Sequence, residues 1–299
     1  VTAGADGYRA ACQLGRTGER SARRLGRRTG GGPREGPRIS VPRVVHMITR
    51  RGGSFGLAAA ATRAGIAALR ANAPGGRGRW ERQNYAGRTV ELYAGPAAVA
   101  GAALGAGRVR PAAGFVVLAA GACGAYDDVA GAGDPRRGFR EHLAALRKGE
   151  VTSGAVKLFG ISAAGLVAGA LLEERLPDKA LAGVVIAGTA HFVNLVDVRP
   201  GRAAGAVLAL GAPGLLRQGA AGELAAAAMG AAAAVLPDDL GERAMIGDSG
   251  AHALGAALGA AIVAGNGRAG LLAHAAALVA ATVYGERVSE LARSIGARK

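Results

Sequence analysis

The amino-acid sequence predicts an all-α, polytopic integral membrane protein with roughly eight to nine transmembrane helices. Half of the 299 residues are hydrophobic but only 4% are aromatic, so Ala and Gly dominate the apolar stretches. The mean hydropathy is positive, at +0.22, and short charged loops separate the apolar segments. These three observations are typical of membrane helices that pack through small side chains.

Residues 1–52 form an arm that differs in composition from the rest of the chain. The arm holds twelve arginines with several glycines and prolines, and it has no apolar periodicity. We predict that it is disordered and that residues 53–299 form the transmembrane domain. Two alternatives stay open. The arm binds anionic lipid, or the true start lies at Met47 and the arm is not part of the mature protein.

The apolar segments define the expected helices in order along the chain. They fall at 54–71, 93–107, 111–126, 155–172, 180–196, 203–216, 220–236, 249–265 and 268–284. Several are shorter than the roughly 20 residues that cross a bilayer. The first segment contains Arg63, so whether residues 54–71 span the membrane stays open.

The loops between these segments predict the orientation of the chain. The two most basic loops, 72–92 and 127–154, are expected on the cytoplasmic side. Strict alternation then brings 197–202, 237–248 and the C-terminus to the same side, whereas a first span at 54–71 would place the basic arm on the other. The acids expected on the cytoplasmic face are Asp127, Asp128, Asp197, Asp238, Asp239 and Asp248.

The charge balance restricts the classes of partner. The formal net charge is +16 and the isoelectric point is about 11.2, a balance also found in nucleic-acid-binding proteins. The basic residues, however, lie mainly in the arm and in the loops. This distribution favours anionic lipid headgroups or phosphorylated substrates, and we expect no nucleic-acid partner. Cys12 and Cys123 are far apart and predict neither a disulfide framework nor a zinc site.

The acids at the ends of the apolar segments suggest a metal and phosphate site. Isolated carboxylates at a membrane boundary are costly unless they are paired, hydrated or metal-bound. Mg²⁺ binds through one or two carboxylates together with substrate phosphates, and arginines bind phosphate oxygens through two N–H groups. The candidate arginines are Arg136, Arg137, Arg140, Arg199 and Arg202. The pattern favours phosphoryl transfer between a nucleotide-linked substrate and a lipid; alternatively, the loop acids only balance the loop arginines.

Short motifs follow one another in a definite order between residues 80 and 290. They are RQNYAGRTVELYAGPAAVAG from Arg82, GAYDDVAG around Asp127, HFVNLVDVRPGRA from His191, MIGDSGAHALGAALG from Met245 and GERVSEL from Gly285. In this order they resemble the polyprenyl-phosphate N-acetylhexosamine-1-phosphate transferase family. This family, glycosyltransferase family 4, includes phospho-N-acetylmuramoyl-pentapeptide transferase.

The resemblance implies a reaction and a set of site residues. Members of the family transfer a sugar-1-phosphate from a UDP-linked amino sugar to polyprenyl phosphate with Mg²⁺ and release UMP. They act at the cytoplasmic face of the cell membrane, in cell-envelope polysaccharide or peptidoglycan precursor synthesis. Asp127 and Asp128 match the catalytic pair, which engages the lipid phosphate or acts as a base, and Asp248 matches the aspartate that binds Mg²⁺. Asn194 and Asp197 match residues of the central motif near the nucleotide and metal, and Lys157 matches a basic residue at the start of the next helix. The charge pattern, and not the resemblance, adds Arg199 and Arg202 as residues expected at the substrate. Family analogy also allows a homodimer.

Departures from the family pattern keep three hypotheses open. Gly131 stands where the Asp-Asp motif has a lysine, and Pro200 replaces the second aspartate of the central motif. The surviving acids favour an active transferase. The two replacements favour an inactive family member that binds polyprenyl phosphate or a cell-wall partner. The third hypothesis is a transporter, which predicts carboxylates in the middle of the spans.

Two smaller expectations concern the histidines and the C-terminal segment. His191, His252 and His274 lie within apolar segments, and we expect them to be hydrogen-bonded core residues. His142 is expected to be solvated in its loop. Residues 287–299 are expected to form a short amphipathic helix on the membrane surface.

Overall fold

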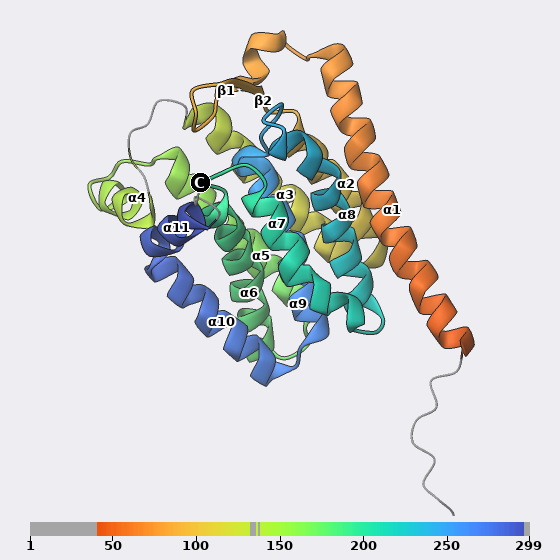
Figure 1. Cartoon of the computed structure of the whole chain (residues 1–299). Coiled ribbons are helices and arrows are strands. Elements are labelled where there is room, and N and C mark those ends of the chain that lie inside the picture. Colours follow the sequence, from red (N-terminus) through yellow and green to blue (C-terminus); the bar gives the residue numbers. More distant parts are fainter. Residues whose placement is uncertain (1–40, 132–135, 137, 296–299) are drawn as a thin grey trace, which may run out of the picture. The chain divides into compact units, whose positions relative to one another are not determined.

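The computed structural model describes residues 41–131, 136 and 138–295 of the chain. The chain divides into two units, 1–43 and 44–299. Of the first unit, the structure describes only residues 41–43, which are the start of one helix. The described part of the second unit is a bundle of α-helices with one two-stranded sheet (Figure 1). The predicted all-α class is confirmed.

The helices follow the predicted apolar segments in chain order. Each of these segments forms a helix, and the amphipathic helix expected near the C-terminus is α11. Helix α4 was not predicted. The helices are α1 (Val41–Asn72), α2 (Ala94–Val109), α3 (Pro111–Ala130), α4 (Gly138–Arg147), α5 (Ser153–Leu172), α6 (Leu176–Val196), α7 (Arg202–Gly211), α8 (Ala220–Leu240), α9 (Gly247–Gly265), α10 (Arg268–Val283) and α11 (Gly285–Ser294), with 3₁₀ turns at Arg77–Trp80 and Ala212–Leu216.

A short hairpin precedes α2 in the basic loop. Strand β1 (Glu81–Gln83) pairs antiparallel with β2 (Thr89–Glu91). Asn84 shapes the turn, because its side-chain oxygen accepts hydrogen bonds from two backbone N–H groups of the turn, at 2.9 and 3.0 Å. A backbone bridge between Glu91 and Ala244 ties the hairpin to the segment that leads into α9. The hairpin thus contributes to the position of the α9 N-terminus.

Four helices in the described ranges are long and apolar enough to cross a membrane, namely α3, α5, α6 and α8. The number rises to five if α10 and α11, which meet at 85°, count as one broken span. The helices are therefore compatible with a membrane protein. The larger number of eight or nine spans is not confirmed. One reason is length: α2 has only 16 residues and α7 only 10.

The predicted boundary of the N-terminal arm differs from the structure. Residues 41–52 were expected to be disordered, but they belong to α1. Arg50 pairs with Glu223 at 3.4 Å, and Arg51 donates a hydrogen bond to the carbonyl of Arg217. These contacts to distant parts of the chain support a helix that local composition does not predict. Residues 1–40 of the arm lie outside the described residues.

The interior of the bundle is made of small side chains, and many large apolar side chains face outward. Helix α9 is almost wholly buried and packs against α2, α3, α6 and α8. Its Gly255 and Gly259 lie against the backbone of Ala190 and Ile186 on α6, an approach that a larger residue would prevent. Less than half of the apolar stretch of α3, α5 or α6 is buried. This distribution is typical of helices that face lipid.

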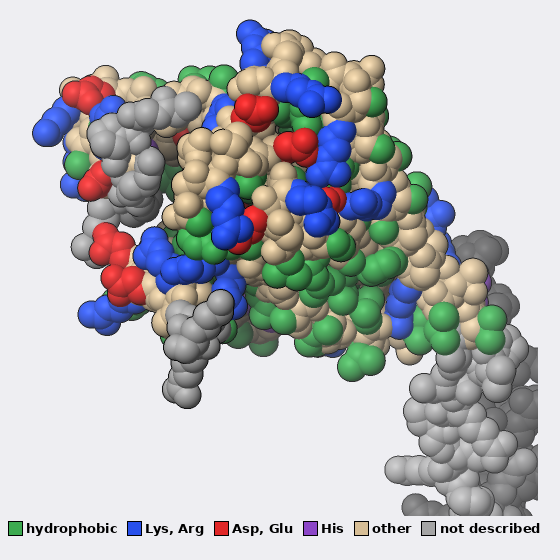
Figure 2. All heavy atoms as spheres, turned by 45° about the horizontal axis from the view of Figure 1, so that its top comes forward, with side chains coloured by type: hydrophobic (Ala, Val, Ile, Leu, Met, Phe, Trp, Pro, Cys, Tyr) green, Lys and Arg blue, Asp and Glu red, His purple; other side chains and the backbone are tan. Residues whose placement is uncertain are grey.

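Polar side chains gather at one end of the helices. Figure 2 brings the upper end of Figure 1 forward and shows acidic and basic side chains together there, with hydrophobic side chains below them. The C-terminal ends of α3, α6 and α8 meet the N-terminal ends of α5 and α9 at this polar end. Asp178 and Arg268, the starts of α6 and α10, pair at the opposite end. The polar end is where the candidate site lies.

Candidate active site

Asp128 anchors the first turn of α9. Its carboxylate accepts hydrogen bonds from the backbone N–H of Asp248, at 2.9 Å, and of Ser249, at 3.0 Å. The first N–H groups of a helix have no partner within the helix, and the helix dipole favours a negative charge beside them. Gly247 has a φ of +56°, a conformation that glycine adopts readily. Asp128 therefore connects the end of α3 to the start of α9.

Lys157 joins the two other carboxylates of this region. Its Nζ lies 2.5 Å from Oδ2 of Asp127 on α3 and 2.5 Å from Oδ2 of Asp248 on α9. The side chains of Lys157 and Asp127 are 15% exposed and that of Asp248 is 28% exposed. Residues from three separate helices thus form one cluster, which we call the lysine cluster (Asp127, Lys157 and Asp248).

Glycines and a helix cap hold these three helices in position. A Cβ on Gly124 would collide with the backbone of Asp248, and one on Gly95 would collide with that of Ile246. Both glycines therefore permit α2 and α3 to approach the start of α9 closely. Helix α5 begins at Thr152, whose hydroxyl accepts a hydrogen bond from the N–H of Ala155 at 3.0 Å. This cap places Lys157 in the first turns of α5.

Asp197 lies beside other carboxylates, directly after α6. Removal from water raises its pKa well above the ordinary value, and the negative charges of Asp239, Asp248 and Asp128 raise it further. Asp239 accepts a hydrogen bond at 2.7 Å from the backbone N–H of Gly201, which precedes α7 with a φ of +76°. Four helix ends therefore bring acids to one region.

The remaining predicted substrate residues have other contacts. The guanidinium of Arg199 lies over the ring of Tyr85, 4.8 Å from its centroid. Arg202 donates a hydrogen bond to the carbonyl of Ile295. Asn194 is half-buried in the last turn of α6, and its carbonyl accepts a hydrogen bond from the N–H of Asp197. Among the described residues, no hydrogen bond or ion pair joins these three side chains to the lysine cluster.

The basic loop before α5 is described only in part. Arg136 pairs with Glu150 at 2.7 Å. Arg137 and the side chain of Arg140 lie outside the described residues. His142 was expected to be solvated in a loop, but it is half-buried on α4, and its Nδ1 lies 3.0 Å from the hydroxyl of Thr152. The correction follows from α4, whose packing the sequence pattern did not indicate.

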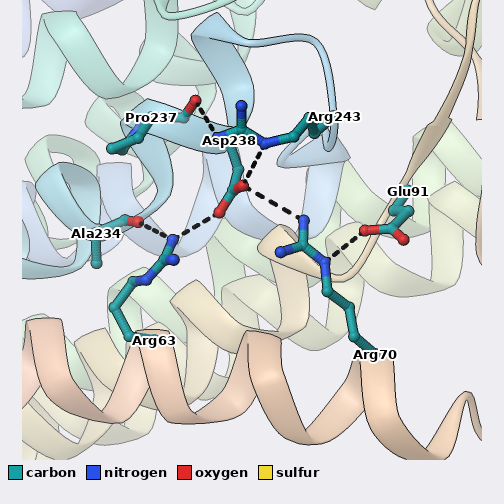
Figure 3. Close-up of polar contacts among 7 residues, drawn as sticks. All are labelled: Arg63, Arg70, Glu91, Ala234, Pro237, Asp238 and Arg243. Carbon is teal, nitrogen blue, oxygen red and sulfur yellow. Dashed lines mark hydrogen bonds and ion pairs between the residues drawn. The ribbon is translucent and has the colours of Figure 1, made fainter.

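A second acidic group at the same end is neutralised by arginines. Asp238, whose side chain is 3% exposed, pairs with Arg63 at 2.6 Å, Arg243 at 3.0 Å and Arg70 at 3.4 Å (Figure 3). Arg70 also pairs with Glu91 at 2.7 Å. We call these five residues the arginine cluster (Arg63, Arg70, Glu91, Asp238 and Arg243). It explains why α1 carries Arg63 in an otherwise apolar stretch, since the guanidinium reaches a buried carboxylate.

Two histidines lie next to the lysine cluster. His252 is fully buried, and its Nδ1 lies 2.7 Å from the carbonyl oxygen of Asp248. Since a carbonyl only accepts, Nδ1 carries the proton and Nε2 is left as an acceptor. The rings of His252 and His191 meet edge to face at 5.4 Å. The Nε2 atoms of both are buried without a hydrogen-bond partner in the described part of the chain, so these are core histidines that are only partly satisfied.

The donor set of the lysine cluster fits Mg²⁺ if substrate or water completes the coordination. Carboxylates from α3 and α9 already converge on one cationic group, the ammonium of Lys157. Mg²⁺ commonly binds through one or two carboxylates together with waters and phosphates. Over the described ranges, no group of three or more His, Cys, Asp or Glu side chains is arranged to hold a metal ion. Asp127 and Asp248 would therefore be the protein ligands.

Sequence reasoning missed Arg82 as a neighbour of the acids. Its Nη2 donates a hydrogen bond to the carbonyl of Asp128 at 3.3 Å. Arg82 is the first residue of the motif RQNYAGRTVELYAGPAAVAG, and its place in this motif was the signal that could have identified it. Its role depends on the hairpin, which brings the loop over the end of α3.

Comparison with known proteins identifies no relative. A scan against models of protein families finds no match for this chain, and a search of curated proteins also finds none.

Proposed function

We propose that this chain is a membrane sugar-1-phosphate transferase. It moves a sugar-1-phosphate from a UDP-linked amino sugar to polyprenyl phosphate, with Mg²⁺, at the cytoplasmic face of the cell membrane. The observation that carries the proposal is the lysine cluster, in which Asp127 and Asp248 meet around one cationic group at the polar end of an apolar bundle. The motif order described above supplies the substrate classes.

The proposal includes the larger number of spans. Helix α2 directly precedes α3, the pair formed by α7 and the 3₁₀ turn after it lies between α6 and α8 along the chain, and α9 lies between α8 and α10. Added to α3, α5, α6, α8 and the α10–α11 pair, they bring the number of crossings to eight, or to nine if α1 also crosses. The exposed apolar side chains of α3, α5 and α6 support contact with lipid tails.

The reaction is a displacement at phosphorus. An oxygen of the polyprenyl phosphate attacks the phosphorus that carries the sugar, the bond from this phosphorus to the bridging oxygen breaks, and UMP leaves with that oxygen. Mg²⁺, when bound, would supply positive charge to the pyrophosphate. Asp127 and Asp248 would hold the cation and Lys157 would offer its ammonium to phosphate oxygens, while Asp128 keeps the start of α9 in register with α3.

The alternative is a family member that binds polyprenyl phosphate without turnover. One observation favours it. Gly131 stands at the C-terminal end of α3, and a Cβ there would crowd the backbone of Asp127 and the hydroxyl of Ser153. The lysine that the family has at this position does not fit without a shift of α3 or α5.

The test is UMP release by the purified protein in detergent. The protein receives polyprenyl phosphate and a panel of UDP-sugars, with and without Mg²⁺. We expect Mg²⁺-dependent release that falls by about 100-fold or more in Asp248→Asn. Asp178→Asn is the matched control, because Asp178 lies at the opposite end and pairs with Arg268, and it should retain activity.

Two outcomes would change the conclusion. No release with any donor, from protein that still binds polyprenyl phosphate, would leave the inactive lipid-binding protein as the better account. Release that does not require Mg²⁺ or Asp248 would place the chemistry elsewhere in the molecule.

A further inference from the structure

We propose that Lys157 is an exchangeable counter-ion. Its ammonium holds Asp127 and Asp248 together when no divalent cation is bound, and a divalent cation displaces it from both carboxylates. The inference deepens the proposed function and rests on it in two respects: the divalent-cation site at Asp127 and Asp248, and the substrate phosphate that the displaced ammonium becomes free to bind.

The geometry gives Lys157 the position of a bound cation. Its Nζ lies 2.5 Å from one carboxylate oxygen on α3 and 2.5 Å from one on α9. The lysine itself comes from α5, so the contact joins three helices that are remote in sequence. An ammonium is a compact point charge with three donors, and two of the three are used by these carboxylates.

The local charges make the ammonium and a divalent cation competitors. Asp128 is already engaged by two backbone N–H groups at the start of α9. The two carboxylates of the lysine cluster, Asp127 and Asp248, together match the charge of one divalent cation. One ammonium neutralises only half of the negative charge of these two carboxylates. Two cations on the same pair of carboxylates would repel each other at short range. Binding of one therefore requires release of the other.

The side chains differ in their freedom to move. Asp248 is held by its backbone, because its N–H donates to Asp128 and its carbonyl accepts from His252. Lys157 is attached through four methylene groups near the start of α5, at the polar end, and is 15% exposed. It can therefore leave by rotation of its own side chain, with no movement of a helix.

His252 leaves one buried acceptor on the turn of α9 that follows Asp248. Its ring is fully buried, and its Nδ1 lies 2.7 Å from the carbonyl oxygen of Asp248. Its Nε2 is an acceptor without a partner in the described residues. A buried acceptor of this kind is costly unless a donor reaches it, and a water molecule that entered with a hydrated divalent cation would be such a donor.

The first experiment measures metal binding alone. Mn²⁺ is titrated into the purified detergent-solubilised protein, and free Mn²⁺ is followed by electron paramagnetic resonance, without any substrate. Lys157→Met keeps the length of the side chain and removes the charge. We expect it to bind Mn²⁺ at least tenfold more tightly than the unchanged protein, and we expect Asp248→Asn to lose the site.

The outcomes separate the inference from the proposed function. If the unchanged protein binds Mn²⁺ through Asp248 but Lys157→Met binds no more tightly, the counter-ion is refuted and the metal site stands. If neither protein binds Mn²⁺, the inference and the metal site both fail. Tighter binding by Lys157→Met without UMP release supports the counter-ion in an inactive protein.

A second experiment needs no variant, so a folding defect cannot obscure it. The protein is treated briefly with an amine-acylating reagent with and without saturating Mg²⁺, and modification of each lysine is measured by mass spectrometry. Displacement should raise modification of Lys157 by at least threefold. Lys148, an exposed loop residue, is the internal control and should not change. Unchanged or reduced modification of Lys157 would overturn the inference.

Discussion

Two acidic clusters lie at the same end of the helices and are neutralised in opposite ways. In the arginine cluster, the buried carboxylate of Asp238 is surrounded by three guanidinium groups, one of which also pairs with Glu91. In the lysine cluster, two carboxylates, Asp127 and Asp248, share a single ammonium. The arginine cluster therefore has more positive than negative groups, whereas the lysine cluster has fewer positive than negative groups.

The difference separates a structural role from a functional one. A buried carboxylate that is fully paired contributes to the fold, because loss of either partner leaves an uncompensated charge. Carboxylates that lack a counter-charge weaken the fold unless a ligand supplies it. We therefore interpret the arginine cluster as a clamp between α1, β2 and α8, and the lysine cluster as a binding site. Each prediction below tests this contrast.

The largest effect on stability should come from the arginine cluster. Asp238→Ala removes a carboxylate that is 3% exposed and that binds three arginines. Its guanidinium partners are partly exposed and recover some hydration, so we expect a loss of about 3 kcal/mol in the free energy of unfolding. Thermal unfolding in detergent measures it. Asp178→Ala, which removes a single ion pair to an arginine that is 47% exposed, should cause a much smaller loss; an equal loss would refute the clamp.

The next effect concerns the close approach of α3 to α9. Gly124→Ala places a Cβ against the backbone of Asp248, which should force the helices apart and cost about 2 kcal/mol. The same change should weaken Mn²⁺ binding, since it moves Asp127 away from Asp248. Gly205→Ala on α7 has open space around it and should be neutral or slightly stabilising. Identical behaviour of the two variants would contradict the packing argument.

Asp197, which lies near the lysine cluster, should destabilise the folded protein at neutral pH. The pKa of Asp197 is raised in the folded protein by burial and by its acidic neighbours, so the folded state binds the proton more tightly than the unfolded state does. Stability from this group is therefore present at or below the ordinary value of 3.8 and is lost as the pH rises toward the raised pKa.

Asp197→Asn should accordingly raise the unfolding temperature at pH 7.5 in the presence of a chelator. The gain should shrink as the pH approaches 4. Lower stability of the variant at pH 7.5 would show that Asp197 has a favourable partner and is not part of an under-neutralised region.

A further effect is stabilisation by the cation itself. A ligand present at ten times its dissociation constant contributes about 1.4 kcal/mol, which corresponds to roughly 3–6 °C for a chain of this size. Mg²⁺ should raise the unfolding temperature of the unchanged protein and of Asp178→Asn, but not that of Asp248→Asn. A rise that persists in Asp248→Asn would assign the ion to another site.

The sequence predicted the helices of the bundle better than the connections between them. Each predicted apolar segment forms a helix, because long apolar stretches need all their backbone groups paired internally. The hairpin before α2 and the amphipathic helix α4 were not predicted, and α1 begins at Val41, earlier than residue 53. The hairpin and the start of α1 are stabilised by partners distant in sequence, namely Glu91 with Ala244 and Arg50 with Glu223.

The sequence by itself determined the all-α class, the apolar segments and the positions of the acids at helix ends, since these depend on local composition and periodicity. Only the tertiary structure decided which partners surround each acid. Asp127, Asp128, Asp238 and Asp248 look alike in sequence, as acids at the ends of apolar segments. Their surroundings make one a helix anchor, one the centre of an arginine cluster and two a pair that shares Lys157. The physical reason is that the environment of a carboxylate depends on side chains and N–H groups brought from other helices, which no local pattern encodes.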